Sequence, residues 1–133
     1  MTPRRAMAMI GLTLAGLVLV APGRPARADA CPAGEGTTVV VDFGDLGGGV
    51  RVGCAPSAST GFEALSQAGF SVTTLSSNPA FVCRIDGLPD PDSEDCVDTP
   101  PGDAFWSYWT ADLGGTWSFN TSGAGGSIRG DLE

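Results

Sequence analysis

The stretch that decides the fold is residues 37–54, TTVVVDFGDLGGGVRVGC. Residues 37–43 are mostly β-branched or aromatic, which predicts a strand. Residues 44–49 form a glycine-rich turn, and residues 50–54 alternate, so they should pair back on the first strand as a hairpin. The turn lacks the GK[ST] ending of a phosphate-binding loop and lies between two strands, which favours the hairpin.

One short helix is predicted after this hairpin. Thr60 and Glu63 have the spacing of a capping box, in which the first side chain caps the helix and the second reaches back. Gly69 is a natural stop. The sequence therefore predicts a helix over residues 61–68.

The rest of the chain reads as short strands around one long loop. Alternating or β-branched segments predict strands at residues 70–75, 80–85, 104–110 and from residue 117. Residues 88–103 contain four prolines and six acidic residues, which predicts a surface loop. This order is typical of an α+β domain, with a mostly antiparallel sheet packed on one short helix.

Four cysteines, Cys31, Cys54, Cys83 and Cys96, are expected to form two disulfides. An even number of cysteines in a small exported domain is typical of such crosslinks. Four cysteines allow three pairings. We favour Cys31–Cys54, which ties the hairpin to its lead-in, and Cys83–Cys96, which closes a short acidic loop. The sequence has no CxxC spacing and no histidine, so a metal site is not favoured.

The first thirty residues have the parts of a secretory signal peptide. Arg4 and Arg5 precede an apolar run over residues 6–20, and the small-residue site ADA ends at Ala30. The flanks of the two arginines fit ordinary Sec export better than a twin-arginine signal, and Asp29 fits a lipobox poorly. We therefore expect residues 1–30 to be removed, leaving a secreted single domain over residues 31–133 with no membrane span.

The charge of residues 31–133 restricts partners and chemistry. Three arginines stand against fourteen acidic residues, so the formal charge is −11. Such a field repels nucleic acid. The whole sequence lacks histidine and lysine, so a serine or cysteine nucleophile has no ordinary base, and we expect no catalytic residues and no cofactor. The alternatives are a carboxylate-based hydrolase and calcium binding by the acidic loop.

Aromatic residues mark the candidate ligand-binding surface. All three tryptophans and the single tyrosine lie within residues 106–117. Strand alternation would place Phe105 and Trp109 on one face and Trp106 and Tyr108 on the other. Aromatic side chains beside polar loops are used to bind flat ligands, carbohydrates and proteins, whereas the alternative is a covered core. The candidate contact residues are Trp106, Tyr108, Trp109 and Trp117.

Several segments together resemble a known family. VVVDFGDLGGGV, GFEALSQAGF, PAFVCRIDGLP, CVDTPPGDAFWSYW and GGTWSF follow one another in this order. They resemble secreted proteins of high-GC Gram-positive bacteria related to the transcobalamin C-terminal-like domain, a family of unknown function. The resemblance covers nearly all of residues 31–133 and implies a β-grasp-like fold. Similar proteins continue past the glycine-rich tail into another strand, which leaves open whether a final strand or an anchor follows.

The resemblance also implies a function. In cobalamin carriers the related domain covers one face of the corrinoid, which suggests a secreted, non-enzymatic ligand-binding module for a corrinoid or another transported nutrient. Without histidine, a corrinoid would be held by contact and not by coordination of its cobalt. The alternative function is a cell-surface protein-interaction or structural domain.

Overall fold

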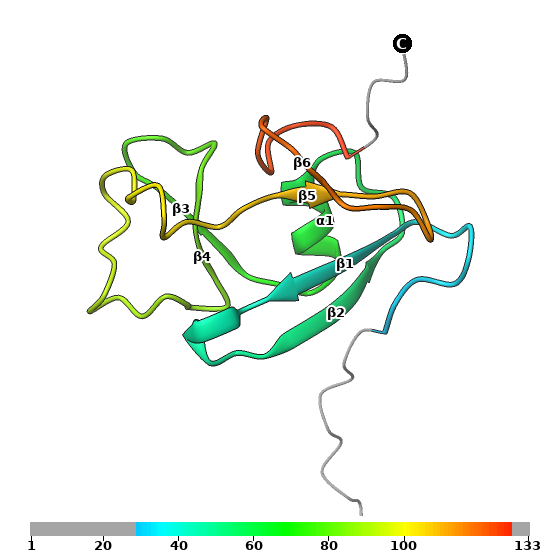
Figure 1. Cartoon of the computed structure of the whole chain (residues 1–133), viewed down its shortest axis with the longest axis horizontal. Helices are drawn as coiled ribbons and strands as arrows, with labels where there is room; N and C mark the ends of the chain where they lie inside the picture. Colours follow the sequence, from blue (N-terminus) through cyan, green and yellow to red (C-terminus); the bar gives the residue numbers. More distant parts are fainter. Residues whose placement is uncertain (1–28, 129–133) are drawn as a thin grey trace, which may run out of the picture.

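The computed structural model describes residues 29–128. The expected signal peptide lies outside the described residues except for its last two positions. The described chain contains one α-helix, one 3-10 helix and six strands (Figure 1). In order they are β1 (Thr37–Asp42), η1 (Gly44–Leu46), β2 (Val50–Ala55), α1 (Gly61–Gln67), β3 (Val72–Thr74), β4 (Val82–Ile85), β5 (Trp109–Thr110) and β6 (Ser118–Phe119).

The predicted hairpin of β1 and β2 is confirmed. The two strands are antiparallel, with Thr37 opposite Ala55 at one end and Asp42 opposite Val50 at the other. The turn contains η1 and closes with a hydrogen bond from the Phe43 N–H to the Gly49 carbonyl, at 2.9 Å. Glycines at φ values of +85° and +67°, at positions 47 and 49, allow this turn because they have no Cβ to clash.

The helix α1 begins where the sequence predicts it. The Thr60 hydroxyl accepts a hydrogen bond from the Glu63 N–H at 3.2 Å, and the Glu63 carboxylate accepts one from the Ser59 N–H at 2.7 Å. The first bond satisfies a helix N–H that has no partner within the helix, and the second ties the residue before the cap to the first turn. The helix ends at Gln67, before Gly69 at φ +89°.

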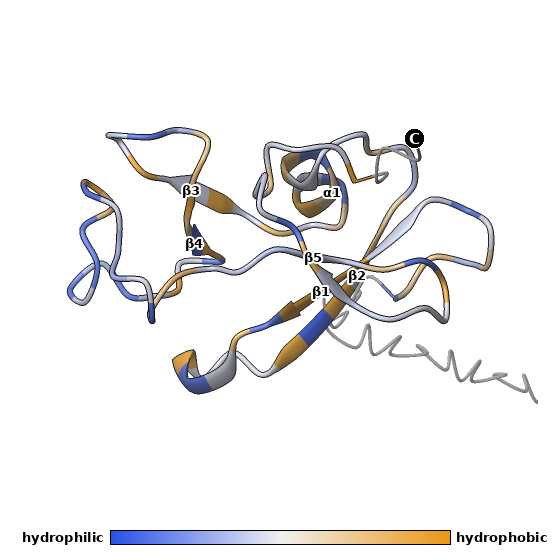
Figure 2. Ribbon diagram, turned by 45° about the horizontal axis from the view of Figure 1, so that its top comes forward, coloured by the Kyte–Doolittle hydropathy of each residue, from blue (hydrophilic) through white to orange (hydrophobic). Residues whose placement is uncertain are grey.

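The inner face of the β1–β2 hairpin packs directly on α1. A Cβ built on buried Gly53 would lie 2.5 Å from the Ala68 carbonyl oxygen, so only glycine permits this approach. Val41, Phe43 and Leu65 are buried beside this contact. Figure 2 shows these hydrophobic segments of β1 and α1 in orange. The same core contains Ala68, Phe70, Val82, Ile85 and Ala124.

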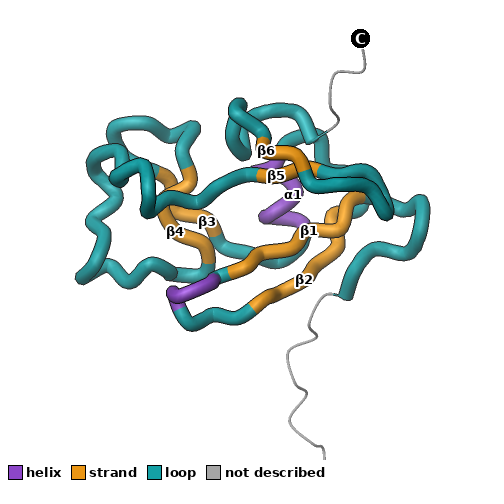
Figure 3. The backbone as a smooth tube through the Cα atoms, in the orientation of Figure 1, coloured by secondary structure: helices purple, strands orange, loops and turns teal. Residues whose placement is uncertain are grey.

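The strands form three separate two-stranded sheets, and not the single sheet that the sequence predicted (Figure 3). β3 pairs with β4 and β5 pairs with β6, in both cases antiparallel. The strand expected over residues 104–110 is wrong for most of its length, because only Trp109 and Thr110 pair with another strand. Residues 104–108 instead follow a bend that starts with a turn between Pro101 and Ala104.

The glycine-rich segment after β6 docks on the start of α1. The Phe62 N–H donates to the Ala124 carbonyl at 2.9 Å, and Thr60 forms a β-bridge with Ser127. Ala124 is buried, and a Cβ on Gly61 would lie 2.8 Å from its Cα. Small residues on both sides therefore permit a close contact that joins the end of the described chain to its only α-helix.

Both predicted disulfides are present. Cys31 is bonded to Cys54 and Cys83 to Cys96, with 23 and 13 residues of sequence separation. Cys83, in β4, and Cys96 are buried with Leu75, which follows β3, in a second small core. Within the described residues, no helix has the length and hydropathy needed to cross a bilayer.

The Gly53 contact gives a first stability prediction. Gly53→Ala should destabilise the fold by about 1–3 kcal/mol, because the added methyl group forces α1 away from β2. Gly102→Ala is the matched control, since a Cβ at this position meets no atom within 4 Å. Urea unfolding followed by circular dichroism measures both variants. Equal midpoints would show that the packing of α1 on Gly53 is not close.

Loss of the Cys83–Cys96 disulfide gives a second stability prediction. The double variant Cys83→Ser with Cys96→Ser should lose about 3 kcal/mol of stability, because the unfolded chain is no longer constrained by a closed loop of this length. The thermal midpoint of the variant, compared with that of the oxidised parent, measures the loss. A midpoint that does not change would contradict a stabilising role for the crosslink.

Candidate functional site

A cleft of about 700 Å³ separates the β5–β6 hairpin from the body of the domain. All six residues of β1 line one side of it. Residues 105–111, together with Trp117 and Phe119, line the other. In Figure 1, β5 runs alongside β1 with α1 behind both. The inner surface is largely apolar and includes Val39, Val41, Leu65, Ile85, Tyr108 and Phe119.

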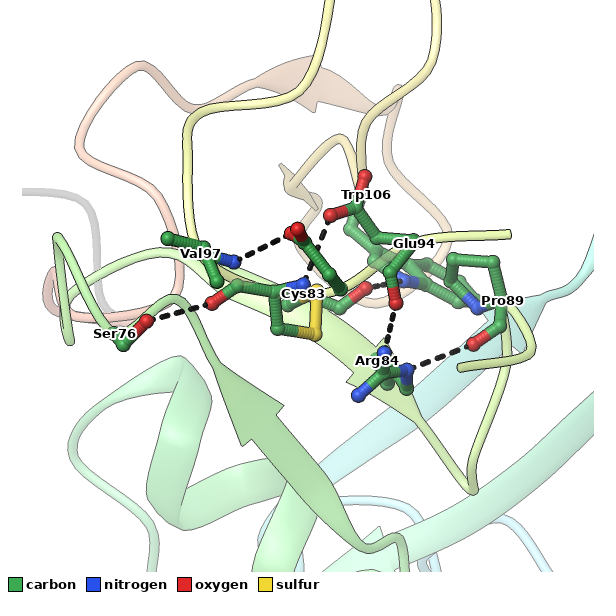
Figure 4. Close-up of a disulfide and its surroundings, with 9 residues drawn as sticks. Ser76, Cys83, Arg84, Pro89, Glu94, Val97 and Trp106 are labelled. Carbon is green, nitrogen blue, oxygen red and sulfur yellow. Dashed lines mark hydrogen bonds between the residues drawn. A yellow bond between two sulfur atoms is a disulfide. The ribbon is translucent and has the colours of Figure 1, made fainter. Parts of the chain in front are cut away.

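Trp106 fixes the wall opposite β1. Its indole Nε1–H donates to the Cys83 carbonyl at 3.1 Å (Figure 4). Its ring meets the Phe43 ring edge-on, with centroids 5.5 Å apart. One residue thus contacts both β4 and the end of the β1–β2 hairpin. Trp106 is half-buried and belongs as much to the core as to the cleft surface.

Tyr108 carries the unusual polar group of the cleft. Its hydroxyl oxygen is buried, and within the described residues it has no hydrogen-bond partner. Burial raises the pKa of Tyr108 above its ordinary value of 10.0, because the phenolate is poorly solvated there. An unsatisfied buried hydroxyl costs about 1–3 kcal/mol, and any polar group that reached it would recover this energy.

Exposed aromatic side chains form the outer part of the same wall. Trp109 and Phe119 lie on neighbouring strands in an edge-on pair, with ring centroids 5.4 Å apart. Trp109 is 47% exposed and Trp117 is 55% exposed. The Trp109 Nε1–H donates to the Ser107 hydroxyl at 3.0 Å, which orients the indole.

The acidic loop is fixed to the body through Arg84. Its guanidinium donates to the Pro89 carbonyl at 3.0 Å and to the Glu94 carbonyl, both shown in Figure 4. The Ser76 hydroxyl donates to the Cys96 carbonyl at 3.1 Å. Together with the Cys83–Cys96 disulfide, these bonds hold the loop beside β4, from which the chain continues to Trp106.

Three carboxylates of this loop accept hydrogen bonds from within the loop itself. Asp90, Glu94 and Asp95 accept hydrogen bonds from backbone N–H groups two residues on, at 2.9–3.0 Å. Such contacts are typical of Asx-type turns. Within residues 29–128, no group of three or more His, Cys, Asp or Glu is arranged to hold a metal ion.

The structure brings all four sequence-predicted contact residues to the cleft: Trp106, Tyr108, Trp109 and Trp117 line it. The expected alternation holds although most of the segment is not a strand. Phe105 and Trp109 are exposed, and the two residues at positions 106 and 108 are half-buried. The sequence analysis did not identify Phe119, whose position follows only from the pairing of β5 with β6. It also did not identify the residues of β1 and α1 as walls of the cleft.

The chain matches no protein-family model, and no curated protein and no solved structure is significantly similar to it.

The burial of Tyr108 predicts its titration. Tyr108 is the only tyrosine, so absorbance at 295 nm follows this residue alone. The native midpoint should lie above 10, whereas urea-unfolded protein should titrate near 10. Because the folded-state pKa is the higher one, the contribution of Tyr108 to stability is fully present below about pH 10 and is lost as the pH rises through the folded-state pKa. Coincident native and unfolded curves would place the hydroxyl in solvent.

Proposed function

We propose that this protein is a secreted, non-enzymatic ligand-binding module, and that the cleft between β1 and the β5–β6 hairpin is its binding site. The observation that carries the proposal is an apolar cleft with one unsatisfied buried hydroxyl, that of Tyr108. Its volume of about 700 Å³ lies within the range of small-molecule sites. Apolar walls supply binding energy, and an isolated polar group supplies orientation.

The proposed compartment and architecture rest on separate observations. The signal-peptide pattern of residues 1–30 and two disulfides both fit an oxidising, extracellular environment. We further propose that the three hairpins around α1 form a β-grasp-like arrangement, as the transcobalamin-like resemblance implies. In support, the β1–β2 hairpin packs across α1 and the later strands are antiparallel.

The proposed small-molecule ligand has a broad apolar face and one group that can hydrogen-bond to Tyr108. Corrinoids and other transported nutrients are the first candidates, because the family resemblance points to them. The chain has no histidine, so a corrinoid would be held by contact with the aromatic wall.

A second candidate function is a cell-surface protein-interaction domain. The observation that favours it is the amount of aromatic surface left exposed next to the cleft, on Phe105, Trp109, Trp117 and Phe119. Grouped exposed aromatics are characteristic of protein interfaces, where tryptophan and tyrosine contribute most of the binding energy.

Tryptophan fluorescence tests the small-molecule proposal, because all three tryptophans line the cleft. Titration with cobalamin, haem and glucose should quench or shift the emission with at least one of them. Tyr108→Phe keeps the ring and removes only the hydroxyl, and it should weaken that binding by about tenfold to a hundredfold.

Leu113→Ala is the matched control for this experiment. Leu113 is 88% exposed in the turn between β5 and β6 and does not line the cleft, so its truncation should leave affinity unchanged. No spectral change with any of the three ligands would reject the small-molecule proposal. Equal loss in both variants would place the ligand outside the cleft.

A further inference from the structure

The edge of β1 that faces away from β2 has unpaired backbone groups. The hydrogen bond from the Phe43 N–H to the Gly49 carbonyl sets the register of the hairpin. In an antiparallel pair, alternate residues exchange hydrogen bonds with the partner strand and the others point their N–H and C=O groups outward. The outward residues of β1 are therefore Thr38, Val40 and Asp42. We call this the outer edge of β1.

No strand of the described chain pairs with this outer edge. Residues 29–128 place β1 in a sheet with β2 alone, and no backbone hydrogen bond is formed there by Thr38, Val40 or Asp42. The outer edge opens on the cleft, since β1 lines it along its whole length. A six-residue strand spans about 20 Å. The cleft therefore presents a row of regularly spaced backbone donors and acceptors.

We propose that the ligand of the cleft is an extended segment of a partner protein, which adds to β1 as a new strand. This inference rests on the second candidate function, protein interaction, because it places that interaction in the same cleft, and it names the class of partner. The repeat of backbone N–H and C=O groups along β1 is matched by another extended polypeptide, and strand addition uses that match. The pairing also satisfies groups that an exposed strand edge leaves open to solvent.

The walls of the cleft set the side-chain pattern of the partner segment. An added strand continues the β1–β2 sheet, so alternate side chains point towards α1, where Ala64, Leu65 and Ile85 line the cleft. These positions accept valine or another compact apolar residue. The intervening side chains point to the opposite face, on which Val40 and Val52 of the hairpin are exposed, so polar residues are tolerated there.

Charge determines the flanks of the partner segment. Residues 31–133 carry a formal charge of −11. Arg51 is paired with Asp86 at 2.9 Å, Arg84 donates to backbone carbonyls, and neither arginine lines the cleft. Asp42 lines the cleft at one end of β1. Basic residues at the ends of the segment are therefore attracted, and acidic ones are repelled.

Three synthetic peptides test the proposal by isothermal titration calorimetry against the oxidised protein. KTVTVTVTK has the alternation and the basic flanks and should bind. KTVTPTVTK has a central proline, which removes a donor and disrupts strand pairing, and ETVTVTVTE reverses the end charges. Both controls should bind at least about tenfold more weakly.

Amide hydrogen exchange locates the added strand. In the free protein, the amides of Val39 and Val41 should be protected by β2, whereas those of Thr38 and Val40 should exchange rapidly. Saturation with KTVTVTVTK should protect the Thr38 and Val40 amides as well. A peptide that binds without protecting them would overturn strand addition to β1.

Two proline variants separate strand addition from general disruption of the hairpin. Val40 and Val52 lie directly opposite each other, and the N–H of each points away from the other strand. Val40→Pro removes a donor from the outer edge of β1, and Val52→Pro makes the same change on the far edge of the hairpin. Val40→Pro should weaken peptide binding by about tenfold or more, and Val52→Pro should not. Circular dichroism verifies that both variants fold.

The outcomes distinguish this inference from the proposed function. Binding of cobalamin, haem or glucose in the cleft without binding of KTVTVTVTK leaves the ligand-binding proposal standing and overturns the peptide. If neither the three small molecules nor KTVTVTVTK binds, both the ligand-binding proposal and the strand-addition proposal are rejected. Concentration-dependent dimerisation that protects the Thr38 and Val40 amides would identify a second copy of the chain as the occupant and would also overturn the partner segment.

Discussion

The hydrogen bond from the Trp106 indole to the Cys83 carbonyl is the contact on which the cleft depends. It fixes the segment before β5 to β4, and the packing of the same ring on Phe43 fixes it to the end of the β1–β2 hairpin. The β5–β6 hairpin has only two residue pairs and cannot hold a position alone. Its placement opposite β1 therefore comes from Trp106 and the Cys83–Cys96 disulfide on one side, and from the docking of Ala124 on the start of α1 on the other.

The sequence predicts the local parts of this molecule well and their assembly poorly. The β1–β2 hairpin, the Thr60 cap of α1 and both disulfides follow from short-range signals such as glycine turns and residue spacing. The division into three small sheets depends on which strand edges meet, and residue periodicity does not encode that. The docking of Ala124 on Gly61 was also missed, because complementarity between two small residues is visible only once the chain is folded.

In the candidate site, too, the sequence predicts the local features and not the assembly. Alternation along residues 105–109 correctly separates the exposed aromatics from the half-buried ones, even though the segment is mostly not a strand. Sequence reasoning named one wall of the cleft, because that wall is a continuous aromatic segment. The opposite walls come from β1 and α1, which lie well before this segment in the chain, and their residues read as ordinary core. The unsatisfied Tyr108 hydroxyl has no sequence signal, since its burial depends on all of these walls together.

Negative charge explains how the domain can retain a strand edge that no other described residue pairs with. An exposed edge normally invites pairing with other copies of the same chain, and proteins commonly suppress this with charged residues. Here residues 31–133 carry a formal charge of −11, and Asp42 lies on the edge itself. Two copies therefore repel each other as they approach, whereas a basic segment is attracted. In the proposed mode of binding, the charge that opposes pairing between copies of the chain also favours a partner segment with basic flanks.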